Sequence, residues 1–455
     1  MYNQLFVELS ESVPELSLEE ILKMRGEHIS ESLSIGHGKP LHITRGEMQY
    51  LYSRSGEKYL DLVNNVCHVG HCNPHVVSAG QKQMAVLNTN TRYIYDGLTQ
   101  YIQRLSYTLP EGLDYGFLVN SGSEANELAI RLARAYTNNH DIVVMEGAYH
   151  GHTGMLIDLS PYKFRGPGGK GIAEDWVHVA PVPDTFRDNS RDYLNEFEGI
   201  VRDAKPIAGF IVESMLSCAG QIPFPQGYLA KSFELIRNVG GLCIADEVQV
   251  GFGRLGSKMW AFEEHGVIPD IVVMGKPIGN GHPMAAVFTT KEIADSFKGM
   301  EFFSTFGGNP VSCAIGMAVM DVIEEKNLIE NSKLMGELFI DGLTKLKNRY
   351  EIIGDIRGKG LFLGIELVKN RSSLEPAPKE AKLLVEGMLS KNILLSIDGP
   401  RKNVIKIKPP MVISKEDVDR TIKSLNEVFG DCLLYTSDAP DEGLGVDLGG
   451  RRIIK

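Results

Sequence analysis

The chain has 455 residues, of which 43% are hydrophobic and 23% charged, and its formal net charge at pH 7 is −11. This length fits two or three globular domains, and the acidic balance argues against a nucleic-acid partner. No apolar run approaches the roughly 20 residues needed to span a bilayer. The six cysteines lack metal-binding or disulfide spacing. We therefore expect no metal site and no membrane span, and a cytoplasmic protein without a leader peptide.

Short apolar runs that end in Gly, Asp, Glu or Lys predict the strands of an α/β domain. Near-continuous runs of this kind are typical of parallel strands buried on both faces. They span residues 116–119, 142–145, 207–212, 242–245 and 271–274. Apolar residues spaced i, i+3, i+4 and i+7 from Ala125 to Tyr136 predict a helix between two of them. We expect a large domain over residues 61–300, with a mostly parallel sheet flanked by helices.

The rest of the chain predicts a smaller α+β domain, built from an N-terminal segment at 1–60 and a C-terminal part at 301–430. Its expected strands and helix are 361–368, 404–407 and 378–389. Ser414, with Asp417 three residues later, predicts the start of a last helix. Residues 431–455 lack clear periodicity and are interpreted as a flexible or non-native tail.

A helix N-terminus follows the first predicted strand of the large domain. In "FLVNSGSEANELA", Ser121 and Glu124 have the spacing of a capping box. This arrangement would leave the backbone N–H groups of Gly122 and Ser123 free. Such a helix end binds phosphate through its N–H donors and its dipole. The alternative is an ordinary capped helix.

Further strand ends carry groups that suit a single cofactor. Tyr149 and His150 follow a strand in "VVMEGAYHGHT", at the sheet edge where open α/β sheets bind ligands. Asp246 ends a buried strand in "CIADEVQVGFGR", where a carboxylate needs a cationic partner. Lys276 ends the next strand in "DIVVMGKPIGNGHP", and a desolvated lysine can attack aldehydes. Each residue has an ordinary structural alternative, but together they describe a site for pyridoxal phosphate.

These motifs, taken in order, resemble those of the class III aminotransferases, which are pyridoxal-phosphate enzymes of fold type I. The matching stretches are "NSGSEAN", "AYHG", "ADEVQVGFGR", "MGKPIGNG" and "TFGGNP". The resemblance covers roughly residues 20–430. It implies that Lys276 forms a Schiff base with the cofactor and shuttles protons, and that Asp246 keeps the ring nitrogen protonated. It also implies a two-fold homodimer with active sites at its interface.

The same resemblance implies the other contacts of the cofactor. They are Val248 and Tyr149 on the two ring faces, Gln249 at the phenolic oxygen, Gly122 and Ser123 at the phosphate, Thr305 at the phosphate bound by the neighbouring subunit, and His150 and Glu213 close by.

The substrate side resembles one subgroup, the ethanolamine-phosphate and phosphohydroxylysine phospho-lyases. The stretches that carry this resemblance are "LDLVNNVCHVGHCNP", "SPYKF" and "NVIKIKPPM". Many class III aminotransferases place an arginine where Lys406 stands, to grip a carboxylate. Lysine is a point charge and cannot make that two-pronged contact.

Other candidate substrate contacts come from the same stretches. Asn64 and Asn65 stand where many relatives have a bulky aromatic residue, which indicates a more polar pocket. Lys163, together with Arg165 or Arg187, could meet a substrate phosphate. A solvated surface charge is an equal alternative for Lys163 and Lys406. His68 is equally well interpreted as a structural histidine or a substrate contact.

The sequence therefore leaves two enzymatic activities open. The first is a class III aminotransferase that passes the amino group of a primary amine to a keto acid or aldehyde. The close alternative is a phospho-lyase that eliminates phosphate from O-phosphoethanolamine or a related phosphorylated amino alcohol. A non-catalytic protein that binds pyridoxal phosphate is a third possibility, against which the intact Lys276 and Asp246 argue.

Overall fold

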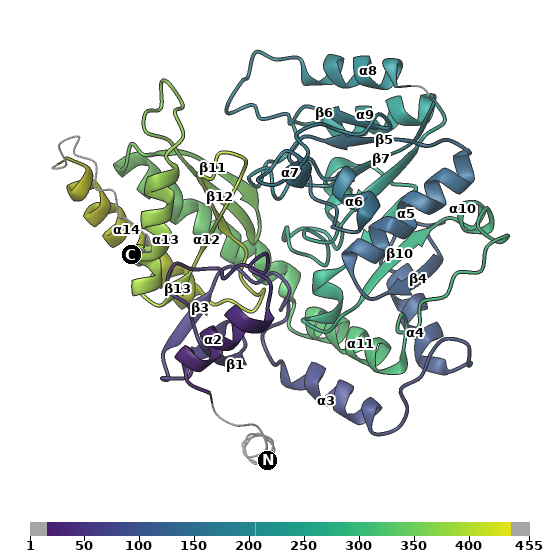
Figure 1. The fold of residues 1–455 in the computed structure, drawn as a ribbon, viewed down its shortest axis with the longest axis horizontal. Coiled ribbons are helices and arrows are strands. Elements are labelled where there is room, and N and C mark those ends of the chain that lie inside the picture. Colours follow the sequence, from purple (N-terminus) through teal and green to yellow (C-terminus); the bar gives the residue numbers. More distant parts are fainter. Residues whose placement is uncertain (1–15, 205, 438–455) are drawn as a thin grey trace, which may run out of the picture.

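The chain folds into two domains that lie side by side (Figure 1). The computed structural model describes residues 16–204 and 206–437, with side chains up to residue 431. The predictions for the first 15 residues and for 438–455 lie outside the described residues. None of the described helices combines the length and apolarity needed to cross a membrane.

A mixed sheet forms the centre of the large domain. In sheet order its strands are β4 (Tyr115–Val119), β10 (Ala285–Thr289), β9 (Ile271–Met274), β8 (Leu242–Asp246), β7 (Ile207–Glu213), β5 (Asp141–Met145) and β6 (Val177–Ala180). β9, β8, β7, β5 and β6 pair in parallel, whereas β10 is antiparallel to both of its neighbours. The predicted, mostly parallel sheet is confirmed. The carboxyl ends of the parallel strands meet at one edge, where such sheets bind ligands.

Helices cover both faces of this sheet. α5 (Gly122–Thr137) lies along one face and buries Ala125, Leu128 and Leu132 there. The predicted helix is confirmed, although Tyr136, expected on its apolar side, is exposed at its last turn. On the other face, α8 (Tyr193–Asp203) packs on β6 and α9 (Tyr228–Asn238) on β7 and β8. The remaining helices of this domain are α3 (Pro74–Met84), α4 (Asp96–Ser106), α6 (Gly154–Asp158), α7 (Pro161–Phe164), α10 (Lys291–Asp295) and α11 (Pro310–Glu325), with the 3-10 turns η1 (Ala261–His265) and η2 (Lys276–Gly279).

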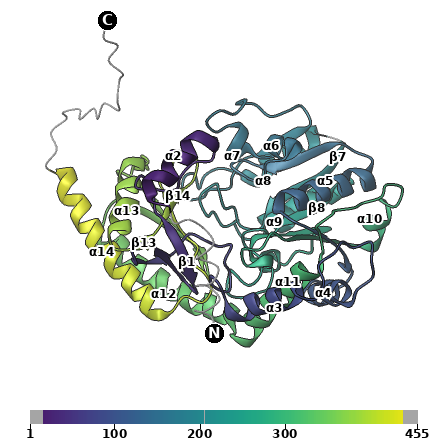
Figure 2. The same ribbon diagram turned by 60° about the horizontal axis from the view of Figure 1, so that its bottom comes forward.

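The small domain joins the two ends of the chain. Strands β1 (Ile43–Glu47), β2 (Tyr50–Ser53) and β3 (Lys58–Asp61) are antiparallel, and β13 (Ile393–Leu394) adds in parallel beside β3. A second, antiparallel sheet has the order β11 (Ile353–Lys359), β12 (Phe362–Leu367), β15 (Val404–Ile407) and β14 (Ser396–Asp398). The helices of this domain are α2 (Leu18–His28), α12 (Leu328–Arg349), α13 (Pro378–Ser390) and α14 (Lys415–Ser437). Figure 2 shows α12, α13 and α14 together at the outer side of the domain.

Two helices bear on the predicted domain boundaries. α11 packs against α3 and α4 of the large domain, so the C-terminal part of the small domain begins nearer α12 than residue 301. Ser414 caps α14 as predicted, with its hydroxyl accepting from the Asp417 backbone N–H at 3.3 Å. That helix continues to Ser437, so the first residues of the predicted tail, 431–437, are helical.

Candidate active site

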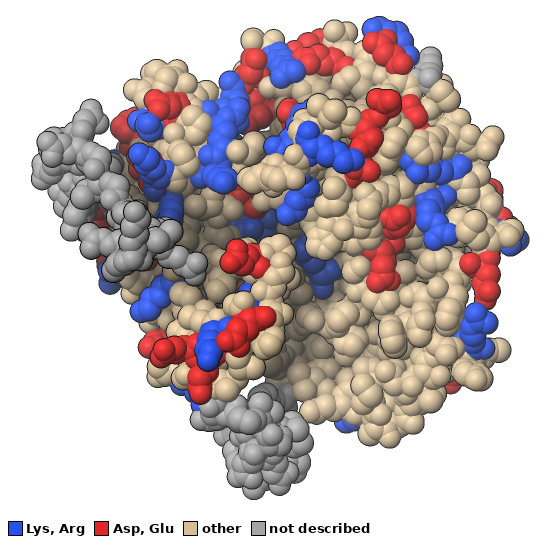
Figure 3. Space-filling model, viewed as in Figure 1, with Lys and Arg blue, Asp and Glu red and all other residues tan. Residues whose placement is uncertain are grey.

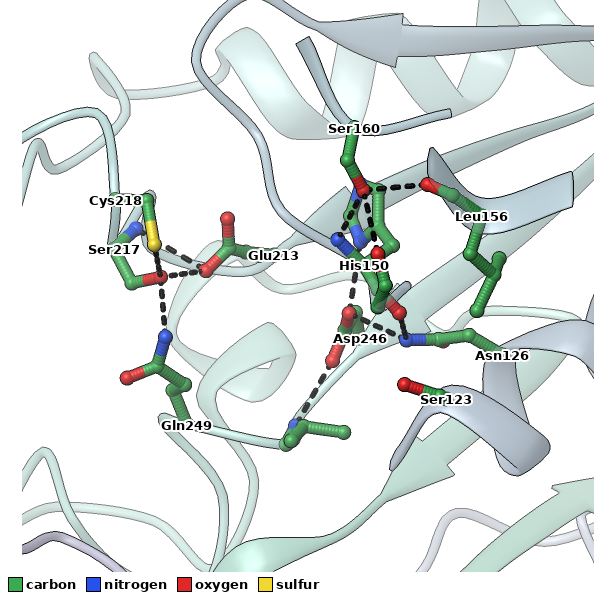
Figure 4. Close-up of polar contacts among 12 residues, drawn as sticks. Ser123, Asn126, His150, Leu156, Ser160, Glu213, Ser217, Cys218, Asp246 and Gln249 are labelled. Atoms are coloured by element: carbon green, nitrogen blue, oxygen red, sulfur yellow. Dashed lines mark hydrogen bonds and ion pairs between the residues drawn. The ribbon is translucent and has the colours of Figure 1, made fainter. Parts of the chain in front are cut away.

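A buried carboxylate, Asp246, lies at the carboxyl end of β8 with 3% of its surface exposed. Its Oδ2 accepts hydrogen bonds from Asn126 Nδ2 at 2.9 Å and pairs with His150 Nδ1 at 2.8 Å (Figure 4). Its Oδ1 accepts from the Val248 backbone N–H at 3.1 Å. A carboxylate has about four acceptor positions, so three contacts leave Asp246 able to accept one more donor.

A small cradle surrounds the N-terminus of α5. Ser121 caps the helix by accepting from the Glu124 backbone N–H at 3.1 Å. Glu124 does not complete the predicted box, because its carboxylate accepts from Asn120 N instead. Among the described residues, the N–H groups of Gly122 and Ser123 have no acceptor. A Cβ on Gly122 would lie 3.1 Å from a Val248 methyl carbon, so the cradle admits only glycine without adjustment.

Lys276 begins η2 directly after β9, and its side chain is half-buried, not fully buried. Its φ of +37° lies in the left-handed region, which costs free energy in any residue with a Cβ. Strain of this kind concentrates at functional positions. Gly275 before it packs against the same Val248, since a Cβ there would lie 3.1 Å from a Val248 methyl carbon. The chain thereby brings Lys276 and Val248 next to the α5 N-terminus.

A chain of hydrogen bonds runs beside this cradle. Gln249 Nε2 donates to Ser217 Oγ at 2.6 Å, and the Ser217 hydroxyl donates to Glu213 (Figure 4). Glu213 is buried, and burial raises the pKa of its carboxyl. Asn65 Nδ2 donates to Gln249 Oε1 at 3.0 Å. The fold therefore brings together Asn65 and Gln249, which are 184 positions apart in the sequence.

Aromatic residues lie beside this group. Tyr149 is half-buried and makes an edge contact with Tyr162, with ring centroids 6.2 Å apart. The ammonium of Lys163 lies 5.7 Å from the centroid of the Tyr149 ring. Burial raises the pKa of Tyr162, and the charge of Asp398 on β14 raises it further. Tyr162 is thus within electrostatic reach of the small domain.

His68 is fully buried, and its contacts favour the structural role over the substrate contact. Its Nε2 donates to the Phe252 carbonyl at 2.7 Å, and its Nδ1 accepts from Arg254 Nη2 at 2.9 Å. Burial lowers the pKa of His68 well below its ordinary value, so the ring is neutral. Both ring nitrogens are occupied, and the histidine joins two parts of the core. Asn64, next to Asn65, is half-buried.

The two arginines considered for substrate phosphate are already paired. Arg165 Nη1 lies 2.8 Å from Glu146 Oε1 at the surface. Arg187 pairs with the buried Glu366 and donates to the Leu374 carbonyl. A second arginine, Arg357, lies 2.5 Å from the same Glu366. The expected substrate role is therefore not supported for Arg165 or Arg187.

The lysines of "NVIKIKPPM" lie on one side of the strand, two residues apart. Lys406 Nζ lies 3.3 Å from Asp398 Oδ1, and its side chain is 22% exposed. Lys408, which was not among the predicted site residues, lies deeper: its Nζ is 3.3 Å from Gln249 Oε1 and 3.6 Å from Asp398 Oδ2. Figure 3 shows other basic side chains along the boundary between the two domains on the viewed face.

The comparisons with known proteins agree with this geometry. A family model described as aminotransferase class-III matches residues 34–429. This chain belongs to the class III aminotransferase family. It is 46% identical over 432 residues to a Drosophila melanogaster protein named alanine–glyoxylate aminotransferase 2-like, covering 91% of this chain and 87% of that one. It is 44% identical to the ethanolamine-phosphate phospho-lyase homolog 1 of Caenorhabditis elegans, covering 91% of this chain and 94% of that one.

A solved structure extends the likeness to the fold. A phospholyase from Arthrobacter, in complex with phosphoethanolamine, superposes with a TM-score of 0.86 at 34% identity. The match covers 90% of this chain and 99% of that one. The predicted fold type I and the predicted family are thus confirmed, and the family includes both aminotransferases and a phospho-lyase.

The class III enzymes depend on pyridoxal phosphate, and the residues of this chain fit that group. The free N–H groups of Gly122 and Ser123 suit its phosphate. Asp246 has an acceptor position left for the ring N–H, and Lys276 would supply the amine for the covalent link. Val248, which packs on Gly122 and Gly275, would contact the ring.

Several cofactor-side roles remain predictions. Thr305 is exposed, before α11, and its contact with a neighbouring subunit's cofactor is one of them. The same holds for the ring contact of Tyr149 and for the hydrogen bond of Gln249 to the phenolic oxygen.

The sequence reasoning missed Asn126, Ser217 and Lys408. Asn126 lies inside the "NSGSEAN" motif, four residues after Gly122, so one helical turn places it over the same end of α5. Ser217 lies four residues after Glu213, but its contacts depend on a loop. For Lys408 a signal existed, since strand alternation places it on the side of Lys406.

Proposed function

We propose that this enzyme is a pyridoxal-phosphate-dependent phospho-lyase that eliminates phosphate from a phosphorylated amino alcohol such as O-phosphoethanolamine. The observation that carries the proposal is the pair of lysines, Lys406 and Lys408, that share the single carboxylate of Asp398 beside Gln249. This pair offers point charges to a substrate anion. It does not offer the guanidinium fork that suits a carboxylate.

The named relatives support the same choice. Similarity to a phospho-lyase homolog, and to a phospholyase solved with phosphoethanolamine, favours phosphorylated amines as substrates. The second candidate is the aminotransferase activity expected first from the sequence. It is supported by the similarity to a protein named alanine–glyoxylate aminotransferase 2-like, at nearly the same identity.

Three residues of this chain would have separate roles in the proposed reaction. When bound, pyridoxal phosphate supplies an electron sink for the carbon that bears the substrate amine. Asp246, held by Asn126 and His150, would accept the ring N–H and keep that proton in place. Lys276 Nζ would take a proton from the carbon that bears the amine and would return a proton to the substrate later. Gln249, fixed by Asn65 and Ser217, would orient the ring.

The overall reaction would break the carbon–oxygen bond to phosphate. With O-phosphoethanolamine and one water, the products would be inorganic phosphate, ammonia and acetaldehyde. Lysine cations near the leaving group would offset the charge that develops on the departing phosphate. No amino acceptor is consumed, which separates this reaction from transamination.

The test uses purified holoenzyme and O-phosphoethanolamine, with and without pyruvate. Inorganic phosphate and alanine are measured in the same samples, and Lys276→Ala protein serves as the control. We expect phosphate release that does not depend on pyruvate and no alanine. Alanine without phosphate would instead establish the transaminase. If neither phosphate nor alanine forms, O-phosphoethanolamine is not a substrate of either reaction.

We further propose that the enzyme is the two-fold homodimer expected from the sequence. Large apolar side chains are exposed near residues 84–94 and 300–306, and contiguous patches of this kind mark protein interfaces. They are Met84, Val86, Tyr93, Ile94, Met300, Phe303 and Phe306. Thr305 lies among them. Light scattering coupled to gel filtration should give twice the chain mass, and the mass of a single chain would contradict the proposal.

A further inference from the structure

Lys408 is a fully buried lysine that the cofactor chemistry described above does not use. Its side chain is 2% exposed, and its Nζ lies over the Phe362 ring, 4.4 Å from the centroid. Its polar contacts, Gln249 Oε1 at 3.3 Å and Asp398 Oδ2 at 3.6 Å, are both long for hydrogen bonds. A buried ammonium has three donors to satisfy. Lys408 is therefore held close to the site without a short, strong partner.

The charges around Lys408 do not balance. Asp398 also accepts from Gln221 Nε2 at 2.9 Å and pairs with Lys406, so one carboxylate serves two lysines. Two other acidic groups face this lysine, and neither offsets the excess. Burial raises the pKa of the Glu213 carboxyl, and burial raises the pKa of the Cys218 thiol to about 12, so burial works against the charged form of each group.

A buried charge that is incompletely paired is costly, and a bound anion would complete its pairing. Lys408 is one hydrogen bond from Gln249, which lies three residues after Asp246 on the active-site edge of the sheet. The excess positive charge therefore adjoins the place where a substrate would react. Lys163 is exposed at the surface, and Lys406 has the shorter contact with Asp398. Lys408 is the better placed of the three for a desolvated anion.

We propose that Lys408 binds the phosphate group of the substrate, and that the group formed by Lys406, Lys408 and Asp398 selects phosphorylated amines over amines without an anionic group. The inference rests on the proposed phospho-lyase function, which it deepens by naming the residue that recognises the leaving group. Lys406 would share the phosphate from the more exposed side. Asp398 would position both ammonium groups.

The first test measures binding of inorganic phosphate to the holoenzyme by titration calorimetry, so that the cofactor's own phosphate site is filled. Lys408→Met should weaken phosphate binding by about tenfold or more, the loss expected for a charge-assisted hydrogen bond. Lys369→Met is the matched control, because Lys369 forms a surface pair with Glu375 at 2.6 Å. The control should bind phosphate like the wild type. Equal phosphate binding by Lys408→Met and wild type would overturn the proposal.

The second test separates recognition from a structural role. For Lys408→Met, the KM for O-phosphoethanolamine should rise by about tenfold or more, while the rate at which an unphosphorylated amine changes the cofactor absorbance should stay unchanged. An equal loss for both amines would mean that Lys408 only supports the fold. Lys408→Gln replaces the Met variant if that protein does not fold.

The two proposals fail separately. If the wild type binds phosphate through Lys408 but releases none from O-phosphoethanolamine, the phospho-lyase function fails and the anion site stands. If the wild type releases phosphate and Lys408→Met does so with an unchanged KM, the function stands and the role of Lys408 is refuted.

Discussion

Replacing Lys408 by Met should make the protein more stable while it weakens phosphate binding. Burial lowers the pKa of Lys408 from 10.5 to about 8. The difference, 10.5 minus 8, is about 2.5 pKa units, and each unit corresponds to about 1.36 kcal/mol. Keeping the ammonium charged in the folded protein at neutral pH therefore costs on the order of 3 kcal/mol.

Methionine would remove that cost at little expense in packing. It is unbranched and apolar, and it would lie on the Phe362 ring that the lysine now covers. Asp398 would keep Lys406 and Gln221 as partners, but it would lose the Lys408 ammonium, which now offsets part of its negative charge. After this offset we expect a net gain of roughly 1–2 kcal/mol in the free energy of unfolding. A stabilising substitution that damages function is typical of a binding site.

The stability difference between Lys408→Met and the wild type should also depend on pH. Between about pH 8 and about pH 10.5 the unfolded chain keeps a proton on Lys408 that the folded chain has lost, so the lysine's contribution to stability rises with pH in this window. The Met variant lacks this contribution. Its advantage over the wild type should be full below about pH 8 and disappear by about pH 10.5.

Urea unfolding of both holoenzymes, at fixed free cofactor, measures this difference at about pH 7 and about pH 10. Lys369→Met again serves as the control, since its ammonium is exposed and paired at the surface. A Lys408→Met protein less stable than the wild type at neutral pH would refute the reasoning. It would mean that Lys408 is retained as a structural partner of Asp398.

Other substitutions test the rest of the site. Lys276→Ala should abolish turnover while circular dichroism stays unchanged; retained activity would refute the site assignment. Gly151 has φ +136°, and a Cβ there would lie 2.6 Å from Ser123 Oγ. Gly151→Ala should therefore cost roughly 2–4 kcal/mol of stability and weaken cofactor retention in dialysis. Gly154→Ala, with nothing within 4 Å of its new Cβ, should change neither stability nor cofactor retention. Equal effects of the two substitutions would contradict the close packing of Gly151 on Ser123. Ser217→Ala should cost roughly 1–3 kcal/mol in urea unfolding, because the partly buried Gln249 Nε2 loses its acceptor; an unchanged midpoint would argue against that contact.

Much of the large domain could be predicted because its signals are local. The apolar runs that became β8 and β9 are buried on both faces, and such runs need no distant partner to be recognised. The candidate cofactor residues Asp246 and Lys276 stood out because charged groups at the ends of buried strands are costly.

What could not be predicted depends on contacts between distant segments. The burial of Lys408 is set by Phe362, Gln249 and Asp398, the second of which lies 159 positions away. His68 was ambiguous for the same reason, since Arg254 and the Phe252 carbonyl occupy its ring. The sequence identified Lys406 through family resemblance, and only the fold showed that the deeper lysine is its neighbour.

Phosphate release from O-phosphoethanolamine by the holoenzyme, compared between the wild type and Lys408→Met without any keto acid, is the decisive test of the phospho-lyase proposal. We expect steady phosphate release by the wild type and a KM for the Met variant that is higher by about tenfold or more. Phosphate release that requires pyruvate, or an unchanged KM in the variant, would contradict it.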